Sequence, residues 1–356
     1  MIWTEWDPLE KIIVGRSYIP GDIDWAIDES VRDSFNIILE ETNQDLDNLS
    51  KFLTDRNVEV FRPTVSVYNN VVNHSNFKIS LPTAPIIPRD QYLVYGNTVY
   101  QTYTSMPDRY QDSINYYSIF QQLFDNGANW ISQPPPVLTN LDHTKNWWED
   151  GGSIYNNYSD RMLWHTATMF KCGDTLITNT AGPGTSRGLA WMQRNLPNAN
   201  IIDNRHTRME NWGHIDHGWF MTDDDTVFCK SKRWVPVSLR NKTIIEIGKY
   251  ITPFKFQEYV GDFSNTAGKF SPEWINKWLN QWKGYMQETH FDTNVLVLDS
   301  KNILFANEQP KLFKFIEGLG INCHVALQRH GMFWDAGIHC LTLDIQRKGL
   351  KRSIIK

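Results

Sequence analysis

The sequence predicts an α/β protein in which one structural unit is repeated around a ring. A β-hairpin, a helix and a further strand follow one another about four times along the chain. No linker rich in Gly, Ser or Pro separates one unit from the next. Because repeats without linkers favour closure into one circular body, we expect residues 1–356 to form a single domain. An ordinary mixed α+β domain is the alternative.

The first unit has a strand, a helix and a second strand. A short β-prone run covers residues 11–14. Apolar residues then recur at helical spacing over residues 33–56, mostly on one face. Residues 58–61 return to a strand pattern. The expected order is therefore strand, long helix, strand.

The next copies contain a complete hairpin. Gly96-Asn97 marks a tight turn between strands at 92–95 and 98–100, and Asn126-Gly127 ends a helix over 113–124. The other expected elements are a strand at 129–132, a hairpin at 167–177, a helix at 185–195, a strand at 201–202, a hairpin at 215–228, a hairpin at 294–305, a helix at 310–318 and a strand at 322–327. The pattern after the 215–228 hairpin predicts no definite element.

The end of the sequence predicts how the ring closes. A strand-like alternation from Ile338 to Ile345 can complete a fifth unit with the N-terminal segment. Residues 134–158 and 252–271 have no periodic pattern and are expected to be long loops. Long loops on a rigid scaffold often cover a substrate.

Composition excludes several classes of protein. Apolar residues make up 41% and charged residues 21%, which is typical of a globular chain. The net charge of −5 argues against a nucleic-acid or anionic-membrane partner. The 4 cysteines form no CxxC pair, so a zinc ribbon or disulfide scaffold is not expected. With no signal-peptide pattern and no apolar run of about 20 residues, we expect a soluble cytoplasmic protein.

Cys340 is the first candidate for chemistry. It follows Ala336-Gly337 and His339, at the start of the predicted terminal strand. A cysteine presented behind a flexible turn is typical of a nucleophilic thiol. A buried cysteine that packs as a small apolar residue is the alternative.

A second candidate pattern is Gly213-His214-Ile215-Asp216-His217. If this segment is a strand, His214 and Asp216 share one face, because strand side chains alternate with period two. A histidine beside a carboxylate can act as a general base. A purely structural hydrogen bond is one alternative. A metal site with His217 is another, but the sequence offers no evident third ligand.

Two further charged residues lie beside predicted hairpins. Asp90 follows Pro88-Arg89 directly before the hairpin at 92–100, where a surface ion pair in a turn is the common alternative. Arg233 follows the hairpin at 215–228. An arginine there can bind an anionic group of a substrate, or it can simply be solvated.

Five motifs in order give the sequence a family resemblance. The motifs are Trp6-Asp7-Pro8-Leu9-Glu10-Lys11-Ile12-Ile13-Val14-Gly15-Arg16, Pro88-Arg89-Asp90, His214-Ile215-Asp216, Ala306-Asn307-Glu308 and Gly337-Ile338-His339-Cys340-Leu341-Thr342. Together they resemble the amidinotransferases of the arginine:glycine and inosamine-phosphate type, which belong to the guanidino-group-modifying enzymes. The resemblance runs from about Trp3 to Leu350.

The resemblance implies a fold and a set of roles. The family fold is a pseudo-symmetric, five-bladed α/β propeller of ββαβ modules, called pentein-like. By resemblance, Cys340 is the nucleophile and His214 the general acid and base, while Asp90 and Asp216 hold the guanidinium of the substrate. No metal or organic cofactor is implied. The implied partners are L-arginine and an amine acceptor, and a homodimer is consistent with the family.

Departures from the family pattern concern the substrate pocket. The family usually has an aspartate that orients the catalytic histidine, where this sequence has His165. A serine pair that helps to bind the carboxylate of the donor is missing around Gln287-Glu288-Thr289, although Arg233 matches the arginine of that site. Ala336-Gly337 replaces a Gly-Gly pair. Asn211 resembles a substrate contact of the family.

Three functions remain open from the sequence. The first is transfer of an amidino group from L-arginine to an amine such as glycine, with release of ornithine. The second is hydrolysis of a guanidine through the same covalent intermediate. The third is a non-catalytic binding protein that has kept the fold, which His165 supports. The joint presence of Cys340, His214, Asp90 and Asp216 favours an enzyme.

Overall fold

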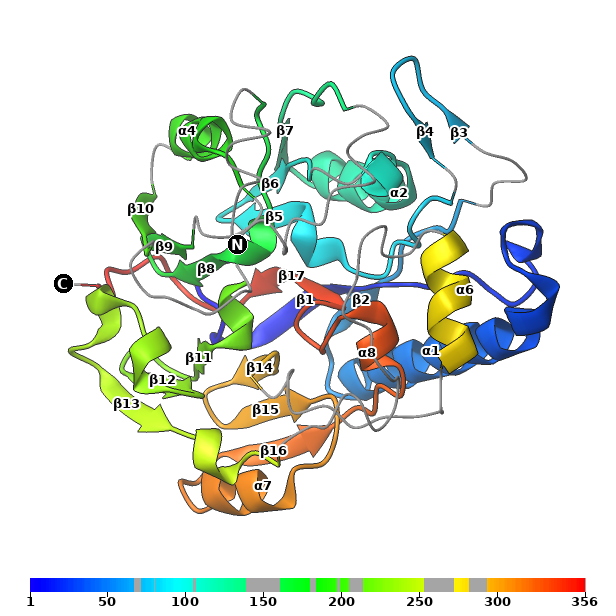
Figure 1. Ribbon diagram of the computed structural model, residues 1–356. Coiled ribbons are helices and arrows are strands. Elements are labelled where there is room, and N and C mark those ends of the chain that lie inside the picture. Colours follow the sequence, from blue (N-terminus) through cyan, green and yellow to red (C-terminus); the bar gives the residue numbers. More distant parts are fainter. Residues whose placement is uncertain are drawn as a thin grey trace.

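Five three-stranded sheets are arranged around a common centre in the described part of the chain (Figure 1). This structure is a computed structural model. It describes residues 1–66, 72–79, 81–104, 107–138, 161–179, 184–196, 199–204, 214–252, 272–281 and 293–355. The ring of small sheets with peripheral helices confirms the predicted α/β propeller of repeated modules.

All five sheets have one plan, in which an antiparallel pair is followed by a strand parallel to the second. The strands are β17 (Thr342–Arg347), β1 (Leu9–Val14) and β2 (Glu59–Phe61) in module I; β5 (Tyr92–Tyr95), β6 (Thr98–Gln101) and β7 (Asn129–Ser132) in module II; β8 (Met169–Cys172), β9 (Thr175–Thr178) and β10 (Asn200–Asp203) in module III; β11 (Trp219–Met221), β12 (Thr226–Cys229) and β13 (Thr243–Glu246) in module IV; and β14 (Leu296–Asp299), β15 (Asn302–Phe305) and β16 (Asn322–Val325) in module V.

The ring is closed by strands from opposite ends of the sequence. β17 pairs with β1 in antiparallel register, with Ile12 opposite Asp344 and Val14 opposite Thr342. The prediction that the terminal strand completes a fifth unit with the N-terminal segment is therefore confirmed. The strand begins at Thr342, so the predicted start at Ile338 is wrong. Residues 338–341 form a turn instead, in which the amide of Leu341 donates to the carbonyl of Gly337.

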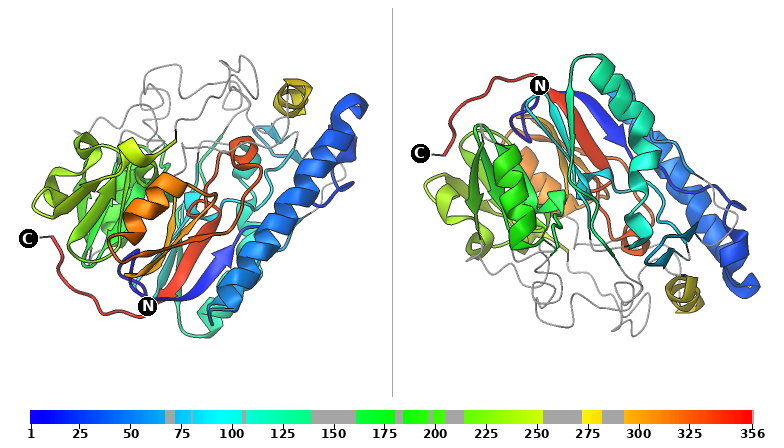
Figure 2. Two further views of the ribbon diagram at one scale, coloured as in Figure 1. Left: turned by 90° about the horizontal axis from the view of Figure 1, so that it is seen from below. Right: turned by 90° about the horizontal axis from the view of Figure 1, so that it is seen from above.

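Helices cover the outside of the ring, where each joins the second and third strands of a module (Figure 2). α1 (Glu29–Thr54), α2 (Asp112–Asp125), α4 (Ser186–Asn195) and α7 (Pro310–Glu317) play this part in modules I, II, III and V. α1 begins four residues before the predicted start at residue 33, and its buried face includes Phe35, Ile38 and Leu46. Burial of this apolar face contributes most to the stability of α1, because helices in proteins are stabilised mainly by tertiary packing.

Module IV departs from the plan. Between β12 and β13 it has two short 3₁₀ helices, η7 (Lys232–Trp234) and η8 (Val237–Leu239), and no described α-helix. This agrees with the absence of helical spacing after the 215–228 hairpin. The remaining described elements are η1 (Asp24–Ala26), the small hairpin of β3 (Val72–Asn73) and β4 (Lys78–Ile79), η2 (Pro88–Asp90), η3 (Pro107–Arg109), η5 (Thr166–Thr168), η6 (Ile215–His217), η9 (Gly248–Tyr250), α6 (Pro272–Gln281) beside α1, and α8 (Gly331–Trp334).

The prediction of two long loops is mostly untested by the structure. Residues 134–138 are extended chain without regular structure, whereas 139–160 and 253–271 lie outside the described residues. Among the described helices, none combines the length and the apolar character needed to cross a bilayer.

The turn between β8 and β9 provides a test of the packing around the C-terminal segment. Gly173 has φ +71°, and a Cβ there would collide with the carbonyl oxygen of Arg352. Gly127 has φ +91° with open space around it. We expect Gly127→Ala to cost about 1–2 kcal/mol of unfolding free energy, from backbone strain alone. Gly173→Ala should cost more, as measured by urea denaturation. Equal losses in the two variants would show that the Arg352 contact does not limit packing.

Candidate active site

Each of the five modules places a polar side chain two to four residues before its first strand. Cys340 precedes β17, Asp90 precedes β5, His165 precedes β8, Asp216 precedes β11 and Asn294 precedes β14. The segments before the strands also touch, because η2 contacts η5 and η5 contacts η6. The ring therefore gathers five residues, far apart in sequence, at one place.

Cys340 is held in its turn by the side chain of Asn294. The Asn294 Nδ2 atom donates to Cys340 Sγ at 3.0 Å, and Asn294 Oδ1 accepts from the Cys340 amide at 3.1 Å. The close approach depends on Gly337, where a Cβ would lie 2.6 Å from Asn294 Oδ1. This contact explains why a glycine precedes the His339-Cys340 pair.

The thiol of Cys340 is deeply buried next to negative charge. Only 2% of the residue is exposed, and Sγ lies 3.7 Å from Asp216 Oδ2. Burial raises the pKa of Cys340 well above its ordinary value, and the carboxylates of Asp216 and Asp90 raise it further. In the free protein at neutral pH, Cys340 is therefore a thiol and not a thiolate.

Asp216 lies in the 3₁₀ helix η6, which corrects one prediction. His214 and Asp216 are not on one face of a strand, because the amide of Gly218 donates to the carbonyl of Ile215 and closes a tight turn. Asp216 Oδ2 instead accepts hydrogen bonds from Nδ2 of Asn294 and Nδ1 of His339, both at 2.7 Å. Burial opposes ionisation of Asp216, but the hydrogen bond and charge of His339 hold its pKa below the ordinary value.

Asp90 and His165 form the opposite side of the site. Asp90 is only 5% exposed, so the surface ion pair considered for it is wrong. Its Oδ2 atom pairs with Arg109, and its Oδ1 atom lies 3.7 Å from Nδ1 of His165. Burial opposes ionisation of Asp90, but His165 and Arg109 lower its pKa below the ordinary value. The site thus contains two ionised carboxylates, Asp90 and Asp216, near one thiol.

His165 packs against His214. The two ring centroids are 4.8 Å apart and the rings are inclined by 27°. Burial lowers the pKa of His165 to about 3, so this ring is neutral at pH 7. His165 therefore supports the His214 ring by contact and supplies no negative charge to it.

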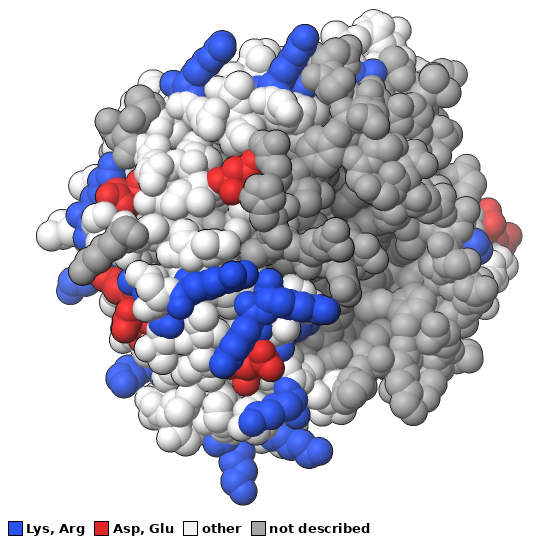
Figure 3. Space-filling model, turned by 60° about the vertical axis from the view of Figure 1, so that its left-hand side comes forward, with Lys and Arg blue, Asp and Glu red and all other residues white. Residues whose placement is uncertain are grey.

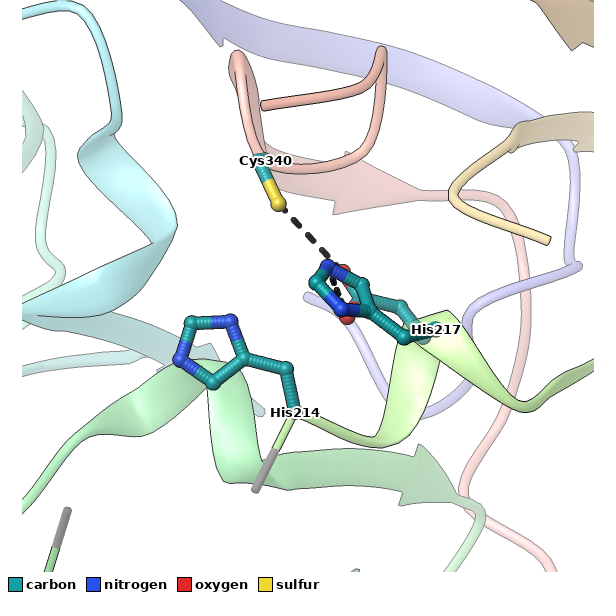
Figure 4. A group of neighbouring side chains, drawn as sticks. His214, His217 and Cys340 are labelled. Carbon is teal, nitrogen blue, oxygen red and sulfur yellow. Dashed lines mark hydrogen bonds and ion pairs between the residues drawn. The ribbon is translucent and has the colours of Figure 1, made fainter. Parts of the chain in front are cut away.

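The side chains of His214, His217 and Cys340 turn toward one another (Figure 4). His214 precedes η6 and is half-buried, and its Nε2 atom has no hydrogen-bond partner among the described residues. The rings of His214 and His217 have centroids 5.5 Å apart. A substrate atom between Cys340 and His214 would face both a nucleophile and a proton carrier.

Two predicted substrate contacts are not tested by this geometry. Arg233 lies exposed in η7, with its guanidinium carbon 5.6 Å from the ring centroid of Trp234. Asn211 lies outside the described residues. The structure therefore brings together Cys340, His214, Asp216, Asp90 and His165, and it leaves the roles of Arg233 and Asn211 as predictions.

Sequence reasoning missed two polar residues of the site. His339 spans two carboxylates, with Nδ1 2.7 Å from Asp216 and Nε2 3.4 Å from Glu5. Asn294 holds the nucleophile. The repeat itself contains the signal for Asn294, because it stands before the first strand of module V as Asp90 does in module II.

A buried ionic cluster lies behind the Cys340 turn. Lys171 Nζ is 2.6 Å from Glu5 Oε1, and Arg89 pairs with Asp344. Arg89 Nε also donates to the carbonyl oxygen of His339 at 2.9 Å. Because the four charged residues are nearly inaccessible, removal of one would leave an unpaired buried charge.

The chain is similar over nearly its whole length to known amidinotransferases, although no family model matches it. It is 22% identical to the L-arginine:L-lysine amidinotransferase of Pseudomonas savastanoi pv. phaseolicola, an alignment that covers 99% of this chain and 96% of the relative. It is also 22% identical to the mitochondrial glycine amidinotransferase of Xenopus laevis, over 99% of this chain and 84% of the relative.

Among solved structures, an amidinotransferase is again similar to this chain. The inosamine-phosphate amidinotransferase of Streptomyces griseus superimposes with a TM-score of 0.75 at 20% identity, covering 100% of this chain and 99% of that one. The chain is therefore similar to amidinotransferases over nearly its whole length, and the resemblance predicted from five motifs is confirmed.

The fold of this chain also resembles those of more distant proteins. A dimethylarginine dimethylaminohydrolase from Pseudomonas aeruginosa superimposes with a TM-score of 0.56 at 10% identity, over 95% of this chain and 99% of that one. At this identity the likeness concerns the pentein fold alone, and it confirms the fold class expected from the resemblance.

The raised pKa of Cys340 predicts the pH dependence of its alkylation. We expect iodoacetamide to modify Cys340 slowly at pH 7, with a rate that increases only at alkaline pH as thiolate forms. Asp216→Asn removes one of the charges that raise the pKa, so alkylation at pH 7 should become faster. Asp225→Asn, at an exposed carboxylate, is the matched control. Peptide mass spectrometry measures each rate, and equal rates in the two variants would contradict the electrostatic explanation.

Proposed function

We propose that this protein transfers an amidino group from L-arginine to an amine through a covalent intermediate on Cys340. The observation that carries the proposal is the position of the Cys340 thiol, which lies 3.7 Å from Asp216 Oδ2 and within 4.8 Å of a ring nitrogen of His214. Asp90 is near enough for its carboxylate to raise the pKa of Cys340. The relatives are amidinotransferases with different acceptors, namely lysine, glycine and inosamine phosphate. They support the reaction class and leave the acceptor of this protein undefined, with glycine as one candidate.

The two carboxylates suit a guanidinium group. Asp90 Oδ1 and Asp216 Oδ1 are buried and have no hydrogen-bond partner among the described residues. A planar guanidinium offers several N–H donors and one positive charge, which matches two carboxylates through paired hydrogen bonds. We infer that both oxygens accept from the guanidinium of the donor and fix its central carbon near Sγ.

The charge of the substrate then activates the nucleophile. In the free protein the Cys340 pKa is raised, and a bound cation acts in the opposite direction by stabilising the thiolate. The Cys340 proton passes to His214, and Sγ forms a bond to the guanidinium carbon. His214 then donates this proton to the departing amine as the carbon–nitrogen bond breaks, so ornithine is released. The amidino group remains on Cys340.

The second half-reaction reverses these proton movements. An acceptor amine enters, and His214 removes a proton from it as its nitrogen attacks the amidino carbon. The carbon–sulfur bond then breaks and the thiolate of Cys340 is restored. Exclusion of water during this interval distinguishes transfer from hydrolysis, in which water would take the amidino group from Cys340 and release it as urea.

The face around module IV suits a donor with a carboxylate. Lys and Arg side chains predominate over Asp and Glu on the side of the molecule where β11, β12 and β13 lie (Figure 3). This side includes η7, which carries the exposed Arg233. Because arginine bears an α-carboxylate as well as a guanidinium, we propose Arg233 as its anionic-group contact.

Incubation with L-arginine alone tests the first half-reaction. We expect intact-protein mass spectrometry to show an increase of about 42 Da, the mass of an amidino group, together with free ornithine. Cys340→Ala should show neither, while Cys323→Ala, at a thiol outside the site, should behave as wild type. Citrulline and ammonia as the products would identify a hydrolase instead. An adduct that persists in Cys340→Ala would contradict the assigned nucleophile.

A histidine at position 165 should give a lower catalytic rate than an aspartate at the same position. A neutral ring cannot stabilise the protonated His214 that forms during turnover, whereas a carboxylate can. We expect His165→Asp to increase the rate of ornithine release from L-arginine by about tenfold. His324→Asp, at a histidine away from the site, should leave the rate unchanged. A decrease in His165→Asp would show that the imidazole has a role of its own.

A further inference from the structure

The site contains four possible metal ligands, and amidino transfer explains only three of them. Cys340, His214, His217 and Asp216 each offer one ligand atom, and all four atoms lie within 4.8 Å of one another. The proposed reaction uses three of these residues but gives no role to His217. His217 is nevertheless only 7% exposed, and its Nε2 atom lies 3.9 Å from Asp216 Oδ1.

These four ligands have the chemistry of a transition-metal site. One sulfur, two imidazole nitrogens and one carboxylate oxygen are the donors that Zn²⁺ prefers in tetrahedral sites. Bond lengths of about 2.0–2.3 Å place tetrahedral ligands roughly 3.3–3.8 Å apart. The longest separation between ligand atoms therefore needs to shorten by at most about 1.5 Å for the four side chains to surround an ion.

The surroundings favour a cation. The site contains the ionised carboxylates of Asp216 and Asp90, and both residues are about 95% buried. Asp216 Oδ1 and His214 Nε2 have no hydrogen-bond partner among the described residues. Figure 4 shows Cys340, His214 and His217 directed into the same space. Buried polar atoms without partners are costly, and a coordinated ion satisfies them.

We propose that Cys340, His214, His217 and Asp216 form a binding site for a divalent transition metal ion of the zinc type. Binding forms a metal–sulfur bond and releases the Cys340 proton to solvent, as metal binding by a thiol requires. The metal-bound protein has no free nucleophile, so the ion acts as a reversible inhibitor of any thiol chemistry at this site. The proposal concerns the free protein and does not depend on which guanidino compound is the donor.

A neighbouring set of ligands provides the internal alternative. Asp90, His165 and His214 also lie within 4.8 Å of one another, and they share His214 with the first set. An ion held there would have no sulfur ligand. The two sites therefore differ in their spectra as well as in the residues on which they depend.

Cobalt substitution tests the assignment, because Co²⁺ takes zinc sites and reports its ligands by absorption. We expect Co²⁺ to give tetrahedral visible bands and a near-ultraviolet thiolate-to-metal band, at one ion per chain. Cys340→Ser should lose the thiolate band, and His217→Ala should weaken binding by about 10-fold or more. Cys323→Ser should keep the wild-type spectrum, and circular dichroism checks the fold of each variant.

Protection of the wild-type thiol is the second measurement, and it needs no variant. Zn²⁺ should slow alkylation of Cys340 while leaving Cys323 unaffected, and Mg²⁺, which prefers oxygen ligands, should have no effect. A cobalt complex without a thiolate band would overturn the proposal, as would a spectrum that survives in Cys340→Ser but is lost in His165→Ala. The latter result would assign the ion to the neighbouring set.

Discussion

The position of Cys340 depends on a buried ionic cluster that lies behind its turn. Glu5, Arg89, Lys171 and Asp344 come from different parts of the chain, and each is at most 4% exposed. Arg89 joins this cluster to the catalytic turn, because it donates to the carbonyl oxygens of His339 and Thr342. Charges so deeply buried are stable only when every partner is present. The cluster therefore fixes several modules and the Cys340 turn in one arrangement.

Much of the fold could be predicted because the turns and helices of the modules have local sequence patterns. Tight turns at Gly96 and Gly173 need a positive φ, and helical spacing separates α1 clearly from its flanking strands. The five motifs added the family and the number of blades. The pairing of β1 with β17 could also be predicted, because the sequence has a strand pattern without a partner at each end of the series of repeats.

The local backbone conformation of the site was harder to predict from the sequence. Alternation of His214 and Asp216 suggested a strand, but a 3₁₀ turn also accommodates two polar residues and leaves both near the centre. The ionic cluster has no sequence signal, because a buried Lys171 looks like any other lysine in a strand until the sheets are assembled. Asn294 was missed because asparagine is common before strands. Only its place in the repeat distinguishes it.

The electrostatics of the site make the thiol responsive to what enters. Burial and two carboxylates raise the pKa of Cys340, so the thiol stays protonated and unreactive until a positive charge binds beside Asp216 and Asp90. In the proposed reaction the guanidinium of the donor supplies that charge, and at the proposed metal site an ion supplies it without a reactive carbon. One arrangement thus links nucleophilicity to the charge of the ligand.

Ring closure also bears on how the protein is made. β1 pairs with β17, although all the other modules lie between them in the sequence. During synthesis the first strand therefore waits for its partner while four complete modules emerge. Until β17 arrives, Asp216 and Asn294 have no thiol beside them, so a nascent chain carries the carboxylates of the site without its nucleophile. Pairing over such a separation is slow, and it makes the appearance of a reactive centre one of the last events in folding.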